Sequence, residues 1–86
     1  MPDFSADTPT PVYVRVADWV ESRIKSGELK AGARLPAERE LARDLGVAYD
    51  TVRRAAVLLR ERRLIVTVHG RGTYVTEPSP QAPDPK

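Results

Sequence analysis

The chain has 86 residues, enough for one small domain, and a domain of this size has little room for an enclosed catalytic cleft. It contains no cysteine, which excludes disulfide bonds and thiolate metal sites, and its formal net charge is +2. No apolar run is long enough to span a membrane, and the start lacks the basic and apolar regions of a signal peptide. We therefore expect a soluble, cytoplasmic domain with no cofactor and no membrane partner.

The positive charge is concentrated in the middle of the chain. Residues 34–71 hold nine basic residues, all arginine, against five acidic residues, whereas the segments before and after each carry a net charge of −1. Arginine is the side chain best shaped for bidentate contacts to phosphate and to guanine. On composition alone, a solvated arginine-rich face explains this distribution equally well.

The first predicted helix begins at Thr10 and Pro11, which suit the N-cap and the first helical position. Its apolar residues recur at helical spacing and form one stripe: Tyr13, Val16, Ala17, Val20 and Ile24. Gly27 is expected to end this helix in a left-handed conformation. Residues 29–36 then form a short connection with a turn at Gly32.

Both ends of the chain are poor in apolar residues. We expect residues 1–10 to be a disordered arm and residues 11–76 to be the folded domain. Residues 77–86 contain four prolines and are expected to be a disordered tail or linker. Nothing after residue 76 resembles a folded unit, so we expect no effector-binding domain in this chain.

Two further helices, separated by Gly46, are predicted from about Ala37 to Leu45 and from Ala48 or Tyr49 to Arg62. The third helix has an inward-facing set at helical spacing: Val52, Ala55, Ala56 and Leu59. Two short helices joined by a tight turn are typical of a helix-turn-helix. In that motif the residues near the start of the second helix reach base edges in the major groove.

After Arg63 the apolar pattern changes from helical to extended. Leu64–Val68 and Thr73–Thr76 are predicted strands joined by a turn over residues 69–72, which makes a β-hairpin, or wing. Arg71 stands between two glycines and could lie against a phosphate or enter the minor groove. A hairpin that only covers the core with a charged tip is the alternative. The predicted fold is therefore mainly α with a small β-hairpin, a winged helix-turn-helix.

These motifs together resemble the N-terminal domain of the GntR family of bacterial transcription regulators. The resemblance covers Pro11 to Val75 and rests on four stretches in the family's order: Leu35-Pro36-Ala37-Glu38-Arg39-Glu40-Leu41-Ala42, Leu45-Gly46-Val47, Thr51-Val52-Arg53 and Gly70-Arg71-Gly72-Thr73-Tyr74-Val75. It implies sequence-specific binding of double-stranded DNA by a regulator, typically a repressor associated with the nucleoid. It also implies a two-fold symmetric operator and a homodimer, because members usually bind paired half-sites.

The resemblance implies DNA contacts from the second helix, the third helix and the wing. The expected DNA-binding residues are Arg39, Tyr49, Asp50, Thr51, Arg53, Arg54, His69, Gly70 and Arg71. Among them, Arg53 is the expected base reader, since a bidentate arginine contact to guanine contributes about 1–3 kcal/mol of discrimination.

The chain departs from the family's pattern in three respects. Ala48 and Tyr49 stand where the family usually has serine or threonine followed by arginine, which removes a helix cap and a guanidinium group. Asp50 would repel phosphate if it faced DNA, although it could serve the helix N-terminus or accept a hydrogen bond from a cytosine amino group. Arg63 replaces a glycine, which predicts a strained backbone.

Two other classes of function compete with DNA binding. A winged helix can also be a protein-interaction module, in which case the arginines would bind an acidic partner. An enzyme is not expected: His69 is the only histidine, and Glu38 and Glu40 stand two apart on a helix, pointing to different sides. A single histidine without a second ligand at defined spacing does not predict a metal site either.

Overall fold

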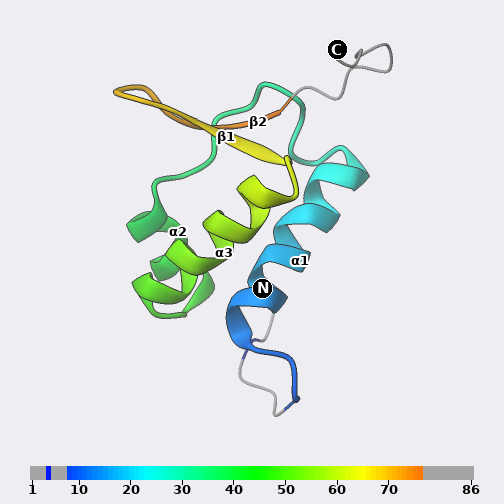
Figure 1. Cartoon of the computed structure of the whole chain (residues 1–86), viewed down its shortest axis with the longest axis vertical. Helices are drawn as coiled ribbons and strands as arrows, with labels where there is room; N and C mark the ends of the chain where they lie inside the picture. Colours follow the sequence, from blue (N-terminus) through cyan, green and yellow to red (C-terminus); the bar gives the residue numbers. More distant parts are fainter. Residues whose placement is uncertain (1–3, 5–7, 77–86) are drawn as a thin grey trace.

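The computed structural model describes residues 4 and 8–76. Three helices precede a two-stranded antiparallel hairpin: α1 (Val12–Ser26), α2 (Glu38–Leu45), α3 (Tyr49–Glu61), β1 (Ile65–Val68) and β2 (Gly72–Val75). The hairpin lies across the C-terminal ends of α1 and α3 (Figure 1). The predicted arrangement of three helices and a wing is confirmed.

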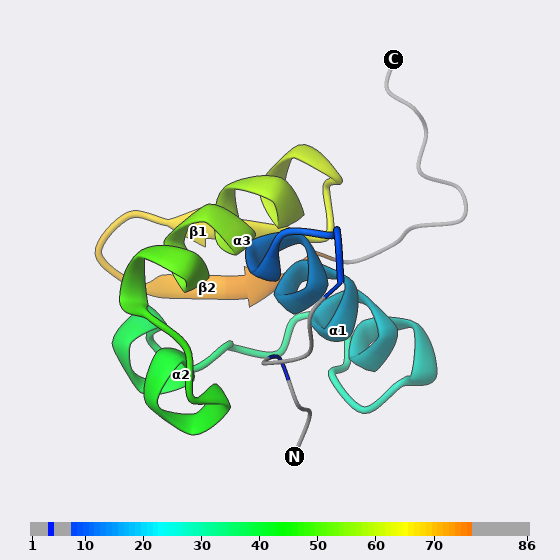
Figure 2. The ribbon, with the colours of Figure 1, turned by 90° about the horizontal axis from the view of Figure 1, so that it is seen from below.

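The core forms where α3 packs against both α1 and α2, as the view from below shows (Figure 2). The inward-facing set predicted for the third helix is buried in full, and the middle of the predicted α1 stripe is buried with it. Elements outside α1 and α3 also contribute side chains to this core: Leu35, Leu45, Ile65 and Val75. Truncating a core residue such as Leu59 to alanine would cost about 2–5 kcal/mol.

Helix α1 begins one residue later than predicted. Pro11 is the N-cap, because its carbonyl accepts the first helical hydrogen bonds, and no side chain caps the helix. The prediction of Thr10 as the cap is therefore wrong; the N–H of Thr10 is bonded to the hydroxyl of Thr8 at 3.2 Å. Gly27 ends α1 in the left-handed conformation, as predicted.

The other two helices begin at alanine caps. Ala37 and Ala48 are the N-caps of α2 and α3, and neither helix has a side-chain cap, which the sequence predicted for α3. Gly46 ends α2 with a φ of 70°. Helix α3 ends at Glu61, one residue before the predicted end.

The chain turns from α3 into the hairpin at Arg63. This residue has a φ of 63°, and it is the one non-glycine residue with positive φ in the described part of the chain. A side chain in this conformation costs about 1–2 kcal/mol relative to the right-handed region. The predicted backbone strain at the family's glycine position is therefore confirmed.

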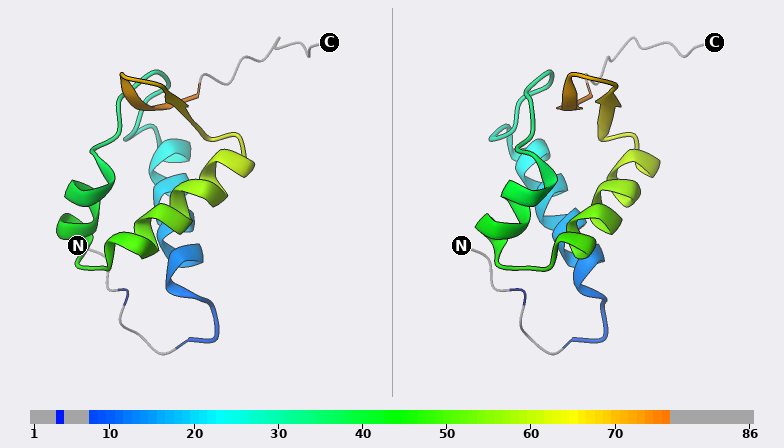
Figure 3. Two further views of the ribbon diagram at one scale, coloured as in Figure 1. Left: turned by 60° about the vertical axis from the view of Figure 1, so that its left-hand side comes forward. Right: turned by 90° about the vertical axis from the view of Figure 1, so that its left-hand side faces the viewer.

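The connection between α1 and α2 also contributes to the sheet, which the sequence did not predict. Backbone hydrogen bonds join Leu35 N to Thr73 O and Val75 N to Ala33 O, both at 2.8 Å, and Arg34 forms a β-bridge with Tyr74. Figure 3 shows this segment rising beside the hairpin. Strand β2 is thus paired on both sides, so the wing is attached to the domain along one of its edges.

Phe4 makes a further contact that sequence reasoning missed. Its ring meets Trp19 edge to face with centroids 6.5 Å apart, and its carbonyl accepts a hydrogen bond from Arg15 at 2.9 Å. The predicted arm (residues 1–10) lies partly outside the described residues, and the predicted tail (residues 77–86) lies wholly outside them, so these boundaries stay predictions. Within the described residues, none of the helices has the length and apolar character that crossing a membrane requires.

Candidate nucleic-acid interface

Tyr49, the first residue of α3, lies between two arginines from different helices. The guanidinium carbon of Arg39, on α2, is 4.4 Å from the centre of the tyrosine ring, and that of Arg53, one turn along α3, is 6.0 Å away. Both distances are within the range of cation–π attraction. The exposed tyrosine therefore orders two cationic groups at the open edge where α2 meets α3.

Asp50 follows Tyr49 and pairs with two arginines of its own helix. Its carboxylate lies 3.5 Å from Nη1 of Arg53 and 3.2 Å from Nε of Arg54. All three side chains are more than half exposed, so each pair stabilises the domain by only about 0.2–1 kcal/mol. The main effect is local: the carboxylate partly neutralises two arginines and holds them near the start of α3.

Thr51 completes the predicted group on α3. It is half-buried in the first turn, and its N–H donates to the carbonyl of Ala48 at 3.0 Å. The structure thus brings together the five predicted residues of α3 and Arg39 of α2 at one edge of the domain.

The predicted wing residues lie at the tip of the hairpin. His69, Gly70 and Arg71 are exposed, and Arg71 N donates to Val68 O at 2.9 Å, which closes the turn. The hydroxyl of Tyr74 donates to the carbonyl of Arg71 at 3.3 Å. The tip projects to the side of the molecule where α2 lies (Figures 1 and 2). The three wing residues are therefore separate from the cluster around Tyr49 but lie on the same side.

A hollow of about 660 Å³ lies between this cluster and the wing, and we call it the basic hollow. Four arginines line it together with the hydroxyl side chains of the strands: Arg34, Arg39, Arg53, Arg60, Thr67 and Thr73. Arg34 and Arg60 were missed in the sequence. Arg60 follows Arg53 by seven residues, so helical spacing alone puts both side chains on one face of α3 and could have predicted it. The position of Arg34 depends on its pairing with β2 and could not.

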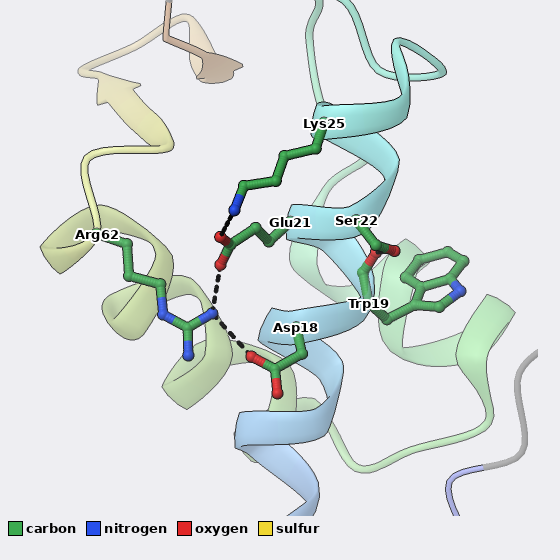
Figure 4. Close-up of polar contacts among 6 residues, drawn as sticks. All are labelled: Asp18, Trp19, Glu21, Ser22, Lys25 and Arg62. Carbon is green, nitrogen blue, oxygen red and sulfur yellow. Dashed lines mark hydrogen bonds and ion pairs between the residues drawn. The ribbon is translucent and has the colours of Figure 1, made fainter.

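The arginine that follows α3, Arg62, reaches α1 instead of the hollow (Figure 4). One of its nitrogens lies 2.9 Å from a carboxylate oxygen of Asp18 and 2.7 Å from one of Glu21. Lys25 approaches the other Glu21 oxygen at 2.8 Å, and its hydrogen bond is the main cause that lowers the pKa of Glu21. The hydrogen bond to Asp18 is the largest cause that raises the pKa of Arg62. This arginine joins two helices, and two carboxylates of α1 offset its charge.

The described residues include no group of three or more histidine, aspartate or glutamate side chains that could hold a metal ion. Four arginines, several hydroxyl groups and one carboxylate, that of Glu38, line the basic hollow. Such an arrangement suits an anion rather than a metal.

Comparison with known proteins agrees with this geometry. Residues 12–75 match the sequence model described as "Bacterial regulatory proteins, gntR family". The chain is 36% identical to the HTH-type transcriptional repressor NagR of Bacillus subtilis over 76 residues, which are 88% of this chain and 31% of that protein. It thus spans less than a third of the length of this curated relative.

Two solved structures are similar in fold as well as in sequence. YtrA from Sulfolobus acidocaldarius, a GntR-family transcription factor, superposes with a TM-score of 0.81 at 38% identity and covers 90% of this chain and 81% of that one. The DNA-binding domain of AraR, crystallised in complex with operator ORX1, has a TM-score of 0.75 at 30% identity, covering 83% of this chain and 92% of that one.

Proposed function

Since this chain belongs to the gntR family of bacterial regulatory proteins, we propose that it binds an operator in double-stranded DNA. In this proposal α3 enters the major groove and the wing lies on the adjacent minor groove or on the backbone. Members of the family are DNA-binding transcription regulators. The operator complex of the similar AraR domain supports the same role here.

The observation that carries the proposal is the cluster of Arg39, Tyr49 and Arg53 at the exposed start of α3. Two guanidinium groups are held there by one aromatic ring, 4.4 and 6.0 Å from its centre. In this proposal Arg53 makes a bidentate contact to guanine, and Arg39 contacts a phosphate or a base at the groove edge. At the wing, Arg71 supplies the contact to the minor groove or to phosphate, beside His69.

The regulatory part of the proposal is repression at a two-fold symmetric operator by a homodimer, at the nucleoid in the cytoplasm. The similarity to a repressor supports the sign of the regulation. A dimer is expected because paired half-sites about one turn of DNA apart need two copies of α3 in register.

Selection of bound sequences from a random duplex pool tests the proposal directly. We expect enrichment of one sequence, and an inverted repeat within it would require two copies of the domain. A protein-interaction module that binds acidic partners would enrich no sequence. Repeating the selection with Tyr49→Arg, which restores the family's usual residue, should change the preferred bases at a fixed position in each half-site.

A further inference from the structure

We propose that the basic hollow binds a phosphodiester of the DNA backbone through Arg34 and Arg60. This inference rests on the proposed function and extends it to two residues outside the expected contact set. The two arginines come from different parts of the chain: Arg34 from the segment paired with β2, and Arg60 from the last turn of α3. Both line the hollow between α3 and the wing.

The position of Arg34 depends on the absence of a side chain at Gly72. A Cβ atom added at Gly72 would come within 2.8 Å of Nε of Arg34, closer than real Cβ contacts allow. Gly72 also has a φ of 128°, which side-chain-bearing residues rarely adopt. The glycine thus leaves room for the guanidinium group to lie across the first residue of β2, inside the hollow.

Arg60 is held by hydroxyl groups rather than by an acid. Its Nη1 donates to Oγ1 of Thr67 at 2.9 Å, and the hydroxyls of Thr67 and Thr73 are 3.2 Å apart. One guanidinium nitrogen is therefore used to orient the side chain, and the remaining donors of the five that arginine carries are left for an anion. A threonine hydroxyl is itself a common donor to phosphate oxygen.

The charge around the hollow is uneven. Among the described residues, neither Arg34 nor Arg60 has a carboxylate within ion-pair distance, whereas Arg53 shares Asp50 with its neighbour. Glu38 is the one carboxylate that lines the hollow, against four arginines. This excess of positive charge fits a ligand that carries a negative charge.

The place of the hollow in the fold identifies the ligand as backbone rather than as base. In the proposed complex α3 and the wing enter adjacent grooves, and a sugar-phosphate strand separates the two grooves of a duplex. That strand must cross the space between the two elements. Phosphates there would face Arg34 and Arg60, while the base edges face the start of α3.

The test is the salt dependence of binding by single variants. Arg34→Gln and Arg60→Gln should each make the slope of log K against log salt less negative by about 0.9, the value for one phosphate contact. The loss of affinity should be the same fold for the selected operator and for a mixed-sequence duplex. Arg34→Lys, which keeps the charge, should retain most of the slope, and thermal unfolding verifies that each variant is folded.

Lys25→Gln is the matched control, because it removes the same charge from α1, away from the hollow. If the arginine variants change the slope no more than this control does, the hollow is not a phosphate site. If they lose more affinity for the operator than for the mixed sequence, they read bases and the inference is wrong. Wild-type protein that binds neither duplex at low salt would instead overturn the proposed function itself.

A neutral methylphosphonate at single positions of the operator locates the contact. At one position in each half-site the substitution should weaken binding by the wild-type protein and have no effect on binding by the Arg34→Gln or Arg60→Gln variant. A wild-type loss that persists in both variants at every position would contradict the assignment.

Discussion

Arg53 and Arg62 belong to the same stretch of chain but have opposite surroundings. Arg62 reaches α1, where Asp18 and Glu21 bind it from an adjacent helix, and its side chain is 29% exposed. Arg53 is 58% exposed, shares the carboxylate of Asp50 with Arg54, and lies beside an exposed aromatic ring. Arg62 joins two elements of the fold, whereas Arg53 is presented to solvent.

The difference shows that an arginine-rich segment holds two kinds of residue. The acids of α1 bind an arginine that stabilises the packing of two helices. Within the described residues, none of the four arginines that line the basic hollow pairs with an acid from another element. In this domain, an arginine that pairs with a carboxylate of another helix holds the fold together, and its position in the sequence does not reveal this.

The largest expected effect comes from Arg53→Ala. Loss of a bidentate base contact should weaken operator binding by about 1–3 kcal/mol, roughly 5- to 150-fold, with a smaller loss on a scrambled duplex. Titration of both duplexes at two salt concentrations measures this. Lys25→Ala on α1 is the control, since it removes one positive charge away from the cluster around Tyr49. Equal losses on both duplexes for Arg53→Ala would remove its role as a base reader.

Arg62→Ala should change stability and leave DNA affinity unaltered. Removing the two ion pairs should lower the free energy of unfolding by about 0.5–1 kcal/mol, and less at high salt. Urea unfolding measures the first effect and duplex titration the second. If the folded Arg62→Ala variant lost DNA affinity, Arg62 would not be a purely structural residue and its contrast with Arg53 would be wrong.

Arg63→Gly should stabilise the domain by about 0.5–1 kcal/mol. Glycine relieves the left-handed strain at this position, and its greater freedom in the unfolded chain offsets part of the gain. The expected result is a higher urea midpoint of unfolding, with an unchanged slope of the unfolding free energy against urea concentration. A lower midpoint would mean that contacts of the Arg63 side chain stabilise the domain by more than the left-handed backbone destabilises it.

Asp50→Asn sharpens the description of the α3 edge. Loss of the carboxylate frees Arg53 and Arg54, so affinity for a mixed-sequence duplex should rise about 2- to 5-fold at low salt and by less at high salt. If Asp50 accepts a hydrogen bond from a cytosine, operator affinity should fall at the same time. No change on either duplex would mean that the two pairs have no influence on binding.

The smallest effect is the pH dependence of the α1 pairs. The pKa of Glu21 is lowered in the folded state from its ordinary value of 4.5, mainly by the hydrogen bond from Lys25. Its contribution to stability is therefore complete above that value and is lost as the pH falls through the folded-state pKa. The difference in Tm between the wild type and Glu21→Gln should therefore narrow from about pH 6 to about pH 3. A difference independent of pH would contradict an ionised, paired Glu21.

Much of this structure could be predicted from local patterns. The helical spacing of Val52, Ala55 and Ala56 identified the buried face of α3, and the glycines after α1 and α2 identified their ends. Even the strain at Arg63 followed from comparison with a family glycine. These features depend on residues close together in the sequence.

The rest depends on contacts between distant segments, which a single sequence does not contain. The pairing of Arg34 with Tyr74 joins positions forty residues apart, and no apolar alternation marks so short a strand. The stacking of Arg39 on Tyr49 requires the angle between two helices to be known. The pairs of Asp50 with Arg53 and Arg54 have the spacing of neighbouring turns and could have been inferred.

The pairing of residues 32–35 with β2 has a mechanical consequence. The same short segment is bonded to the wing and leads within two residues to Ala37, the N-cap of α2, so a movement of the wing is transmitted to the start of α2. A ligand that displaced this segment would alter the distance between the two elements proposed to enter adjacent grooves. Operator affinity would then depend on how this segment is held, without any change in the residues proposed to contact DNA.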